Sequence, residues 1–206
     1  MINNRVLLTR RIQMNSFYSK EELNGIGFAS FGENVLISKK TSIYNAHKIS
    51  IGNNVRIDDF CILSGKITLG NYIHIAAYSA LYGGDKGVEF EDFTGLSSRG
   101  TIYAVTDDYS GEALTNPTIP DEYKKIHSGK VVLEKHVLIG ASSVILPGVI
   151  LAEGSSFGAM SLITKSSEPW SINVGAPARK IKSRSKKLLE LENEFKESLN
   201  WTDKSK

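Results

Sequence analysis

The stretch LEKHVLIGASSVILPGVILAEGSSFGAMSLI, which runs from Leu133 to Ile163, carries a bulky apolar residue at every sixth position. We refer to these residues as anchors, and in this stretch they are Leu133, Ile139, Ile145, Leu151, Phe157 and Ile163. The same step recurs earlier in sets of three, at Phe31, Ile37, Ile43, then Ile51, Ile57, Leu63, then Leu69, Ile75, Leu81, then Phe90, Leu96, Ile102. Eighteen anchors in sets of three imply six coils of a repeating structure.

A period of six indicates short flat strands joined by turns. It matches neither the 3.6-residue period of a helix nor the two-residue alternation of a simple strand. Four residues after an anchor the chain often has a small or β-branched residue, such as Val35, Cys61, Thr106 or Ser143, which can share a narrow interior. Repeats of this length predict a parallel β-helix, in which each coil is buried only against its neighbours. Cys61 is then a buried, inert thiol.

One interruption of the repeat is long. Ile102 and Leu133 are 31 positions apart, so most of this segment must leave the coil as a loop, which we place at 107–130. Loops of such length without regular structure are uncommon in compact domains and are usually functional or disordered. We favour a functional loop, because five apolar or aromatic residues give it groups with which to dock: Tyr109, Leu114, Ile119, Tyr123 and Ile126.

The flanks of the repeat are predicted to be helical. Ser19 and Glu22 form a capping box that opens a short helix ending near Gly25. At the other end Leu188, Leu191, Phe195 and Leu199 recur at helical spacing, as in an amphipathic helix whose apolar stripe needs a surface. We therefore expect an N-terminal segment over 1–30, a β-helix domain over 31–166, and a closing segment with a helix over 167–206.

Composition is that of one ordinary globular domain. The 206 residues are 41% hydrophobic and 23% charged, with a net charge of +3. The basic residues form no concentrated stripe, which argues against nucleic-acid binding. No apolar run approaches the ~20 residues of a membrane span, and Met1 to Lys20 lacks the apolar core of a secretory signal. A cytoplasmic location is expected.

Three motifs make the chain similar to the hexapeptide-repeat acyltransferases. They are Ile139-Gly140-Ala141-Ser142-Ser143-Val144-Ile145-Leu146-Pro147-Gly148-Val149, then Gly158-Ala159-Met160-Ser161-Leu162-Ile163-Thr164-Lys165, then Gly175-Ala176-Pro177-Ala178-Arg179. The chain most resembles the branch that holds the galactoside, maltose and xenobiotic acetyltransferases, together with sugar acetyltransferases of surface-polysaccharide pathways. The resemblance implies a left-handed β-helix, an all-β fold with flanking helices, assembled as a homotrimer.

The resemblance also implies acetyl-CoA as acyl donor, bound without a metal in a cleft between neighbouring β-helices. Carried over to this sequence, the coenzyme-binding residues are Ala141, Ala159, Thr164, Lys165, Arg179 and Lys182. Small side chains let an extended ligand approach the backbone, while Lys and Arg offer charge to phosphates. The bland alternative is that the alanines fit the turn and the cations are only solvated.

The expected catalytic histidine is missing. Enzymes of the galactoside type place it five residues beyond the last anchor before the loop, where this chain has Asp107. A carboxylate is a poor base for a hydroxyl but an acceptable one for an ammonium group, so an amine acceptor is favoured. Asp107 and Asp108 could equally hold the loop turn. We rank His74 first and His136 second as substitute bases.

Asp85, Asp108 and Tyr109 are the expected acceptor-binding residues. Asp85 lies near the position at which the family binds sugar hydroxyls with a carboxylate, although a Gly-Gly-Asp turn explains it as well. The favoured reaction is N-acetylation of a nucleotide-linked amino sugar for O-antigen or other surface polysaccharide.

Three other functions stay open at this point. A sugar O-acetyltransferase of the galactoside or maltose type and a non-catalytic β-helix scaffold are both compatible with the repeat. A zinc hydratase is disfavoured, because His74, His127 and His136 lack the close pair on neighbouring turns. Coenzyme A titration and metal analysis would separate these classes.

Overall fold

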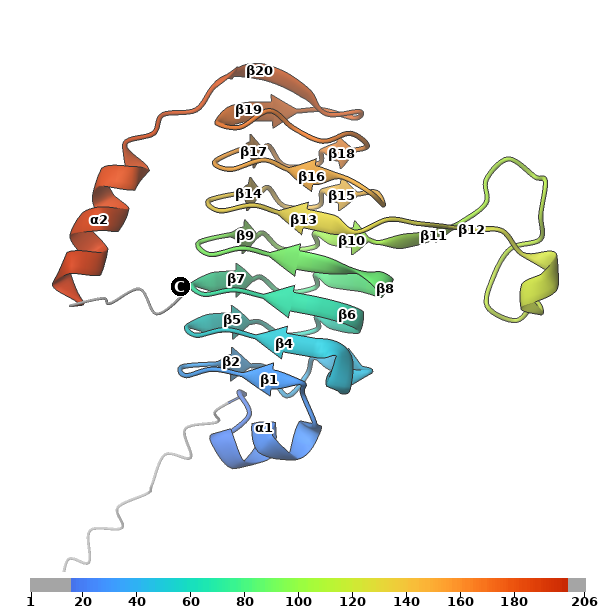
Figure 1. Cartoon of the computed structure of the whole chain (residues 1–206), viewed down its shortest axis with the longest axis horizontal. Coiled ribbons are helices and arrows are strands. Elements are labelled where there is room, and N and C mark those ends of the chain that lie inside the picture. The colour runs from blue at the N-terminus through green and yellow to red at the C-terminus, as the bar shows by residue number, and fades with distance from the viewer. Residues whose placement is uncertain (1–15, 200–206) are drawn as a thin grey trace, which may run out of the picture.

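The computed structural model describes residues 16–199 and shows a left-handed parallel β-helix with one projecting arm and two flanking helices (Figure 1). The expected absence of a signal in Met1 to Lys20 falls mostly outside the described residues. Within 16–199, no helix is long and apolar enough to cross a membrane. The β-helix has three sides, and each coil contributes one short strand to each side.

The strands fall into three parallel stacks. The first side has β1 (Ser30–Phe31), β4 (Ile49–Ile51), part of β6 (Ile62–Leu69), part of β8 (Ala80–Phe90), β13 (Val131–Leu133) and β16 (Ile150–Leu151). The second side has β2 (Leu36–Ile37), β5 (Val55–Ile57), β7 (Ile73–Ile75), β9 (Gly95–Leu96), β14 (Leu138–Ile139), β17 (Ser156–Phe157) and β19 (Ser171–Val174). The third has β3 (Ser42–Tyr44), the starts of β6 and β8, β10 (Thr101–Tyr103), β15 (Val144–Ile145) and β18 (Leu162–Ile163).

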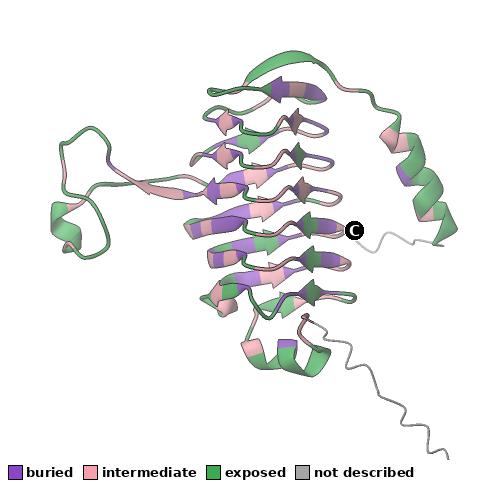
Figure 2. Cartoon of the chain, turned by 180° about the vertical axis from the view of Figure 1, so that it is seen from behind, coloured by how far each residue is buried: buried purple, intermediate pink, exposed green. Residues whose placement is uncertain are grey.

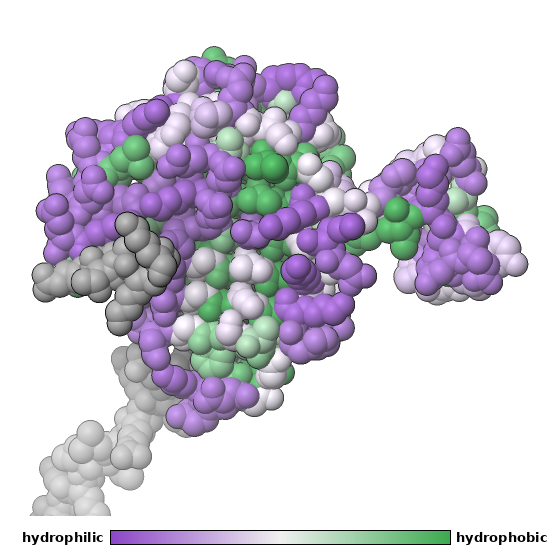
Figure 3. Space-filling model, viewed as in Figure 1, coloured by the Kyte–Doolittle hydropathy of each residue, from purple (hydrophilic) through white to green (hydrophobic). Residues whose placement is uncertain are grey.

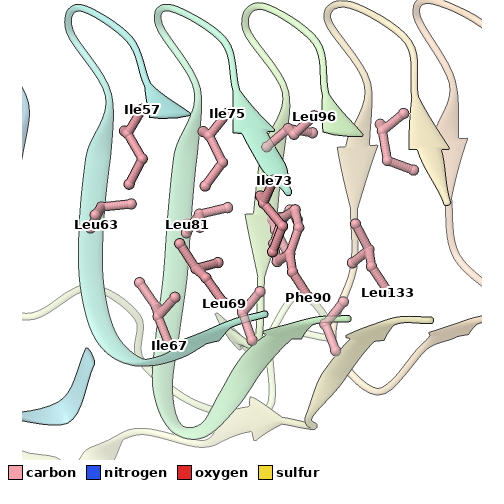
Figure 4. Close-up of a cluster of buried hydrophobic side chains, with 14 of the residues drawn as sticks. Ile57, Leu63, Ile67, Leu69, Ile73, Ile75, Leu81, Phe90, Leu96 and Leu133 are labelled. Atoms are coloured by element: carbon pink, nitrogen blue, oxygen red, sulfur yellow. The ribbon is translucent and has the colours of Figure 1, made fainter. Parts of the chain in front are cut away.

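Anchors stack on anchors, which confirms the period of six. On the second side Ile57 pairs with Ile75, Ile75 with Leu96, and Leu96 with Ile139. All anchors except Phe31 and Ile43 of the first coil are buried. Figure 4 shows Ile57, Ile75 and Leu96 in one row inside the coils, with Leu63 and Leu81 opposite.

The interior positions between anchors are also mostly as expected. Cys61 is buried, and burial raises the pKa of its thiol to about 11, so it is unreactive at neutral pH. Thr106 is the exception, because it leaves the coil on β11 and pairs with His127. Figure 2 shows the purple of buried residues along the strands and green on the projecting arm.

The coil continues one step farther than the anchors indicate. β19 pairs in parallel with β17 and starts a seventh level, with buried Asn173 at the anchor position and buried Ser171 at the small interior position before it. A hairpin then forms with antiparallel β20 (Arg179–Ser183). The polar pair is satisfied internally, since the Asn173 side-chain amide donates to Ser171 Oγ at 2.9 Å.

The two helices flank the coils. α1 (Lys20–Ile26) has the predicted capping box, with Glu22 N–H donating to Ser19 Oγ and Ser19 N–H donating to Glu22 Oε2. It ends at Ile26, near Gly25 as expected, and Gly27 in the left-handed region caps it. α2 (Leu188–Ser198) lies along the corner between the first and second sides. Its Phe195 packs edge-on against Tyr72 and Phe93 of that corner.

The predicted loop is an arm built on a hairpin. β11 (Val105–Asp107) and β12 (Ile126–Ser128) pair antiparallel and carry the chain away from the corner between the third and first sides. Two short 3₁₀ helices lie in connections, η1 (Ala46–Lys48) and η2 (Asp121–Tyr123), the latter at the tip of the arm. Tyr109, Leu114, Tyr123 and Ile126 are all at least half exposed. Within residues 16–199, these side chains therefore do not dock on the coils of the same chain.

Candidate active site

The base of the arm holds a buried carboxylate. Asp108 follows β11 directly and is almost fully buried. Ser110 Oγ lies 2.9 and 2.7 Å from its two carboxylate oxygens and donates to it, and the Ser110 N–H adds a longer bond. His127 Nε2, from β12, lies 3.2 Å from Asp108 Oδ1. The antiparallel hairpin thus brings an aspartate and a histidine 19 residues apart into contact.

These hydrogen bonds keep Asp108 ionised. The bond from the Ser110 hydroxyl lowers the pKa of Asp108 most, burial opposes it, and His127 adds a further lowering, with a resulting pKa of about 2. The carboxylate is therefore negative throughout the neutral pH range. A fixed negative charge of this kind can accept a hydrogen bond from an amine or hold an ammonium group.

Two aromatic rings lie at the end of the third side, where the arm leaves the coils. Tyr82 and Tyr103, from neighbouring coils, stack with centroids 5.1 Å apart. Burial raises the pKa of Tyr103, with smaller contributions from Tyr82 and Tyr109. Tyr109 itself is 91% exposed at the start of the arm. Asp107, the residue predicted as base, lies on β11 opposite Ile126, and no described residue hydrogen-bonds to its carboxylate as Ser110 does to that of Asp108.

A second carboxylate–histidine pair lies on the second side. His74 on β7 places its Nε2 2.7 Å from Asp58 Oδ2, and Arg56 Nε donates to the other oxygen at 2.7 Å. Burial would raise the pKa of Asp58, but the bonds from Arg56 and His74 outweigh it and lower the pKa. The His74 ring is half exposed, and its contact with Asp58 fixes its orientation. Within one chain it belongs to a different side from the arm, so the chain does not bring His74 and Asp107 together.

His136 is unsuited to the role we ranked second for it. It lies at the corner under α2, is 7% exposed, and has its Nε2 2.7 Å from Glu192 Oε2. Its ring also stacks on Phe93. A histidine held in this way between the coil and a helix cannot reach a substrate, so we assign it to packing. Asp85 is exposed at a coil corner and pairs with Lys48 at 3.0 Å, and it shares no hydrogen-bond partner with Asp108 among the described residues.

Three of the expected coenzyme-binding residues come together. Thr164, Lys165 and Arg179 line one groove of about 340 Å³ between β18 and the β19–β20 hairpin. Neither Lys165 nor Arg179 forms an ion pair with any residue in 16–199, whereas neighbouring Lys180 pairs with Glu168 at 2.6 Å. Two unpaired cations beside a hydroxyl fit an anionic, phosphate-bearing ligand.

The other three lie elsewhere on the chain. Ala141 and Ala159 stack on adjacent coils at the corner between the second and third sides, where the Met160 N–H donates to the Ala141 carbonyl. This corner and the groove are at opposite ends of β15 and β18. Lys182 lies on β20 opposite Ile172. A single chain therefore presents the predicted coenzyme site as two separate surfaces.

The sequence pattern did not predict the hydrogen-bond partners that lower the pKa values of Asp108 and Asp58. Ser110 lies two residues after Asp108, which is a common spacing for a local hydroxyl–carboxylate contact and could have been noticed. The contact with His127 depends on the hairpin, and that of Asp58 with His74 depends on coil stacking. In residues 16–199, no three His, Cys, Asp or Glu side chains gather as they would around a metal ion.

We compared the sequence and the fold with those of known proteins. No family model matches the sequence. The chain is 50% identical over 186 residues to dTDP-4-amino-4,6-dideoxy-D-glucose acyltransferase of Escherichia coli, covering 89% of this chain and 96% of the relative. It is 62% identical to AntD, an N-acyltransferase from Bacillus cereus solved with dTDP and 3-hydroxybutyryl-CoA, with a TM-score of 0.89 over 91% of this chain and all of AntD.

A more distant structure supports the fold alone. Galactoside acetyltransferase in complex with coenzyme A is 19% identical, with a TM-score of 0.52 over 81% of this chain and 70% of that one. Its likeness agrees with the coil architecture and says nothing further about chemistry. The near-complete coverage at 50% identity is decisive. The chain belongs to the left-handed β-helix, hexapeptide-repeat family of sugar acyltransferases, and it is an acyltransferase.

Proposed function

We propose that this enzyme transfers an acyl group from acyl-CoA to the 4-amino group of a dTDP-linked 4-amino-4,6-dideoxy sugar. The observation that carries the proposal is the crystallised complex of AntD, 62% identical, with dTDP-4-amino-4,6-dideoxyglucose and coenzyme A. Two features of this chain support it independently. The ionised carboxylate of Asp108 lies one residue after the position at which enzymes of the galactoside type carry a histidine, and the Thr164–Arg179 groove has two cations without ion-pair partners among the described residues, suited to coenzyme phosphates.

The chemistry asks for a neutral amine that attacks a thioester. As the new C–N bond forms the C–S bond breaks, the nitrogen becomes positive and loses a proton, and the coenzyme leaves as a thiolate that takes one up. Asp108 can accept the amine's hydrogen bond and stabilise the charge that develops on nitrogen. His127 can share the departing proton through its contact with Asp108.

A site assembled from two copies would unite the separate surfaces. We propose a homotrimer in which the arm and Asp108 of one copy face the corner of a neighbour that carries Ala141 and the His74–Asp58 pair. The arm supports this, since its exposed apolar residues project away from the coils in the part of the chain that the structure describes. The flat sides add exposed Leu36, Leu138 and Ile150, and Figure 3 shows an apolar green area between hydrophilic surfaces.

Assembly is testable by sedimentation of the full chain and of a variant with substitutions in the arm. Sedimentation equilibrium of the full chain should give three times the monomer mass, because closed cyclic symmetry satisfies every heterologous contact. A variant with Tyr123→Ser and Leu114→Ser removes apolar area from the arm alone, and it should dissociate at higher concentration than the full chain. A stable, active monomer would sink the proposal.

Coenzyme binding is testable at Arg179. Because the Arg179 guanidinium is exposed and unpaired with any described carboxylate, Arg179→Ala should weaken acyl-CoA binding by ~1.5 to 3 kcal/mol, the range for a hydrogen bond to a charged group. Isothermal titration with coenzyme A measures this, and Lys180→Ala, which removes an ion-paired cation of the same groove, should have the smaller effect. An unchanged affinity in Arg179→Ala would assign the residue to the hairpin's structure.

The acceptor and the acyl group are decided by one assay. dTDP-4-amino-4,6-dideoxyglucose should be turned over, and galactosides and maltose should not, with acetyl-CoA and 3-hydroxybutyryl-CoA compared as donors. Acylated nitrogen, rather than oxygen, in the product separates this function from an O-acetyltransferase, and coenzyme A binding without any turnover would favour a scaffold.

A nucleotide-linked product is an activated glycosyl donor. We place its use in O-antigen or other surface-polysaccharide synthesis, and the enzyme in the cytoplasm.

A further inference from the structure

One end of the β-helix carries most of the positive charge of the chain. From Thr164 to Lys187 the sequence has seven Lys and Arg residues and a single acid, Glu168, which gives this stretch a net charge of +6. The whole chain carries only +3, so all the other residues together carry −3. The stretch forms the last level of the coils, the β19–β20 hairpin and the connection to α2. Positive charge is therefore concentrated at the C-terminal end of the coils.

Three lysines and an isoleucine of this stretch are exposed and lie outside the coenzyme groove, and we call them the basic end: Ile181, Lys182, Lys186 and Lys187. Ile181 and Lys182 are on β20, which closes the stack in Figure 1. The connection after β20 is held on the last coil, because the Arg184 N–H donates to the Trp170 carbonyl at 2.8 Å. Lys186 Nζ lies 5.5 Å from the Trp170 ring. The four residues therefore share the end surface of the coils.

The other cations of this stretch are already engaged. Lys180 pairs with Glu168 at 2.6 Å, and Lys165 and Arg179 line the coenzyme groove. Arg184 is partly buried and donates to two backbone carbonyls of the coils, at 2.8 and 3.0 Å. In contrast, none of the three lysines of the basic end has a carboxylate partner within residues 16–199. Their charges are free to meet a ligand outside the chain.

An exposed apolar residue among these lysines narrows the kind of partner. Ile181 is 57% exposed and stands between Lys180 and Lys182 in the sequence. Lysines on an edge strand can serve only to prevent strand pairing, and that explanation suffices for Lys182 on β20. It does not apply to Lys186 and Lys187, which lie beyond the strand. Cations around an apolar side chain are the composition with which peripheral proteins bind anionic lipid surfaces.

Symmetry widens the surface. In the proposed homotrimer the three coils stand side by side, so cyclic symmetry places three copies of the basic end on one face. A partner that contacts all three must present negative charge over a broad, continuous area. A bilayer with anionic headgroups does so, whereas nucleic acid is bound by a single basic stripe with interleaved rings. Charge complementarity thus favours a lipid surface.

We infer that the basic end is a docking surface for an anionic membrane, with its lysines at the lipid headgroups and Ile181 in the interfacial layer. Bound in this way, the enzyme directs α1 and the first coil away from the bilayer. The inference goes beyond the proposed function and does not depend on which sugar is the acceptor.

Vesicle co-sedimentation of the full chain tests the inference. Vesicles that contain phosphatidylglycerol should bind the enzyme, and phosphatidylcholine vesicles should not. Binding should disappear at about 0.5 M salt, where the Debye length is only a few Å. Lys182→Gln/Lys186→Gln/Lys187→Gln should weaken binding by ~10-fold or more, because each lysine near an anionic surface adds about fivefold in affinity. Ile181→Ser should weaken binding by the same factor at every salt concentration.

The control removes the same charge from the other half of the coils. Lys20→Gln/Lys66→Gln/Lys86→Gln changes three exposed lysines of α1, β6 and β8, and it should bind the vesicles as the unaltered enzyme does. Circular dichroism and sedimentation, measured for every variant, show that fold and assembly persist. Saturating coenzyme A should leave vesicle binding in place, since the groove cations are not those of the basic end.

The outcomes separate this inference from the proposed function. Equal losses in the two triple variants, or equal binding to phosphatidylcholine, would overturn the basic end as the docking surface. Displacement of the vesicles by coenzyme A would overturn it as well, by assigning the attraction to the coenzyme groove. Enzyme that binds phosphatidylglycerol vesicles through the basic end but does not acylate the dTDP-linked sugar would defeat the proposed function and leave the inference intact.

Discussion

Asp108→Asn should lower kcat by about 10²- to 10³-fold, the range for removal of one preorganised group that stabilises charge developing in the transition state. The substitution keeps the shape of the side chain but removes the negative charge that we propose for stabilising the attacking amine. Coenzyme A affinity should stay close to that of the unaltered enzyme, since the contacts of Asp108 are with Ser110 and His127 and not with the Thr164–Arg179 groove. Steady-state kinetics and a coenzyme titration measure both quantities.

The pH dependence of this loss follows from the pKa of Asp108. The folded pKa of about 2 is below the ordinary value of 3.8, so the carboxylate is already fully ionised at pH 5 and above. The ratio of kcat between the unaltered enzyme and Asp108→Asn should therefore be constant from pH 6 to pH 9. A ratio that changes across that window would show that Asp108 titrates there and is not the fixed charge described above.

Two further variants assign the proton. His74→Ala should abolish the acidic limb of the pH profile if the His74–Asp58 pair is the base, and leave it intact if the amine itself sets that limb. Asp107→Asn tests the residue that the motif spacing indicated. Near-full rates in all three variants would mean that the enzyme only positions an already neutral amine, with effective concentration supplying the acceleration.

The coil could be predicted from the sequence because its interior is narrow. Each anchor must fill the same small cross-section, so the period of six is imposed at every coil and survives in a single sequence. The apolar repeat in the sequence ends at Ile163. β19 fills the next level with Ser171 and Asn173, which are satisfied by hydrogen bonds. An apolar periodicity cannot reveal a coil whose interior is polar.

The site could be predicted only where its chemistry is local. Thr164, Lys165 and Arg179 follow motifs, and they do share a groove. Asp108 was placed among acceptor-binding residues, but its strength as an anion comes from Ser110 and from His127 across a hairpin that no pattern showed. The role of His136 was missed for a similar reason, since its partner Glu192 is 56 residues away on a helix whose position the sequence does not fix.

Glu192→Ala should destabilise the folded protein by roughly 2 to 3 kcal/mol, somewhat less than the 3 to 5 kcal/mol expected when a fully buried ion pair loses one partner, because its lysines are partly exposed. The carboxylate of Glu192 is 6% exposed and accepts from three groups of the corner and the helix. Lys135 Nζ lies 2.7 Å away, His136 Nε2 2.7 Å and Lys196 Nζ 2.8 Å. It is the polar link by which α2 is held on the coils, and urea unfolding measures its loss.

The acid sensitivity of that link has a defined sign. Burial alone would raise the pKa of Glu192, but the bonds from Lys135, Lys196 and His136 outweigh burial and lower it from 4.5 to about 2. A lowered carboxylate pKa stabilises the fold above the unfolded value and loses that contribution as pH falls toward the folded value. The stability difference between unaltered enzyme and Glu192→Gln should be constant from pH 7 to about 5 and shrink below 4.5.

Glu190→Gln, on the exposed part of the same helix, is the matched control and should change stability little at either pH. A difference that grows as pH falls would show that Glu192 is protonated in the folded protein and that α2 is held by apolar contacts with Phe195 alone.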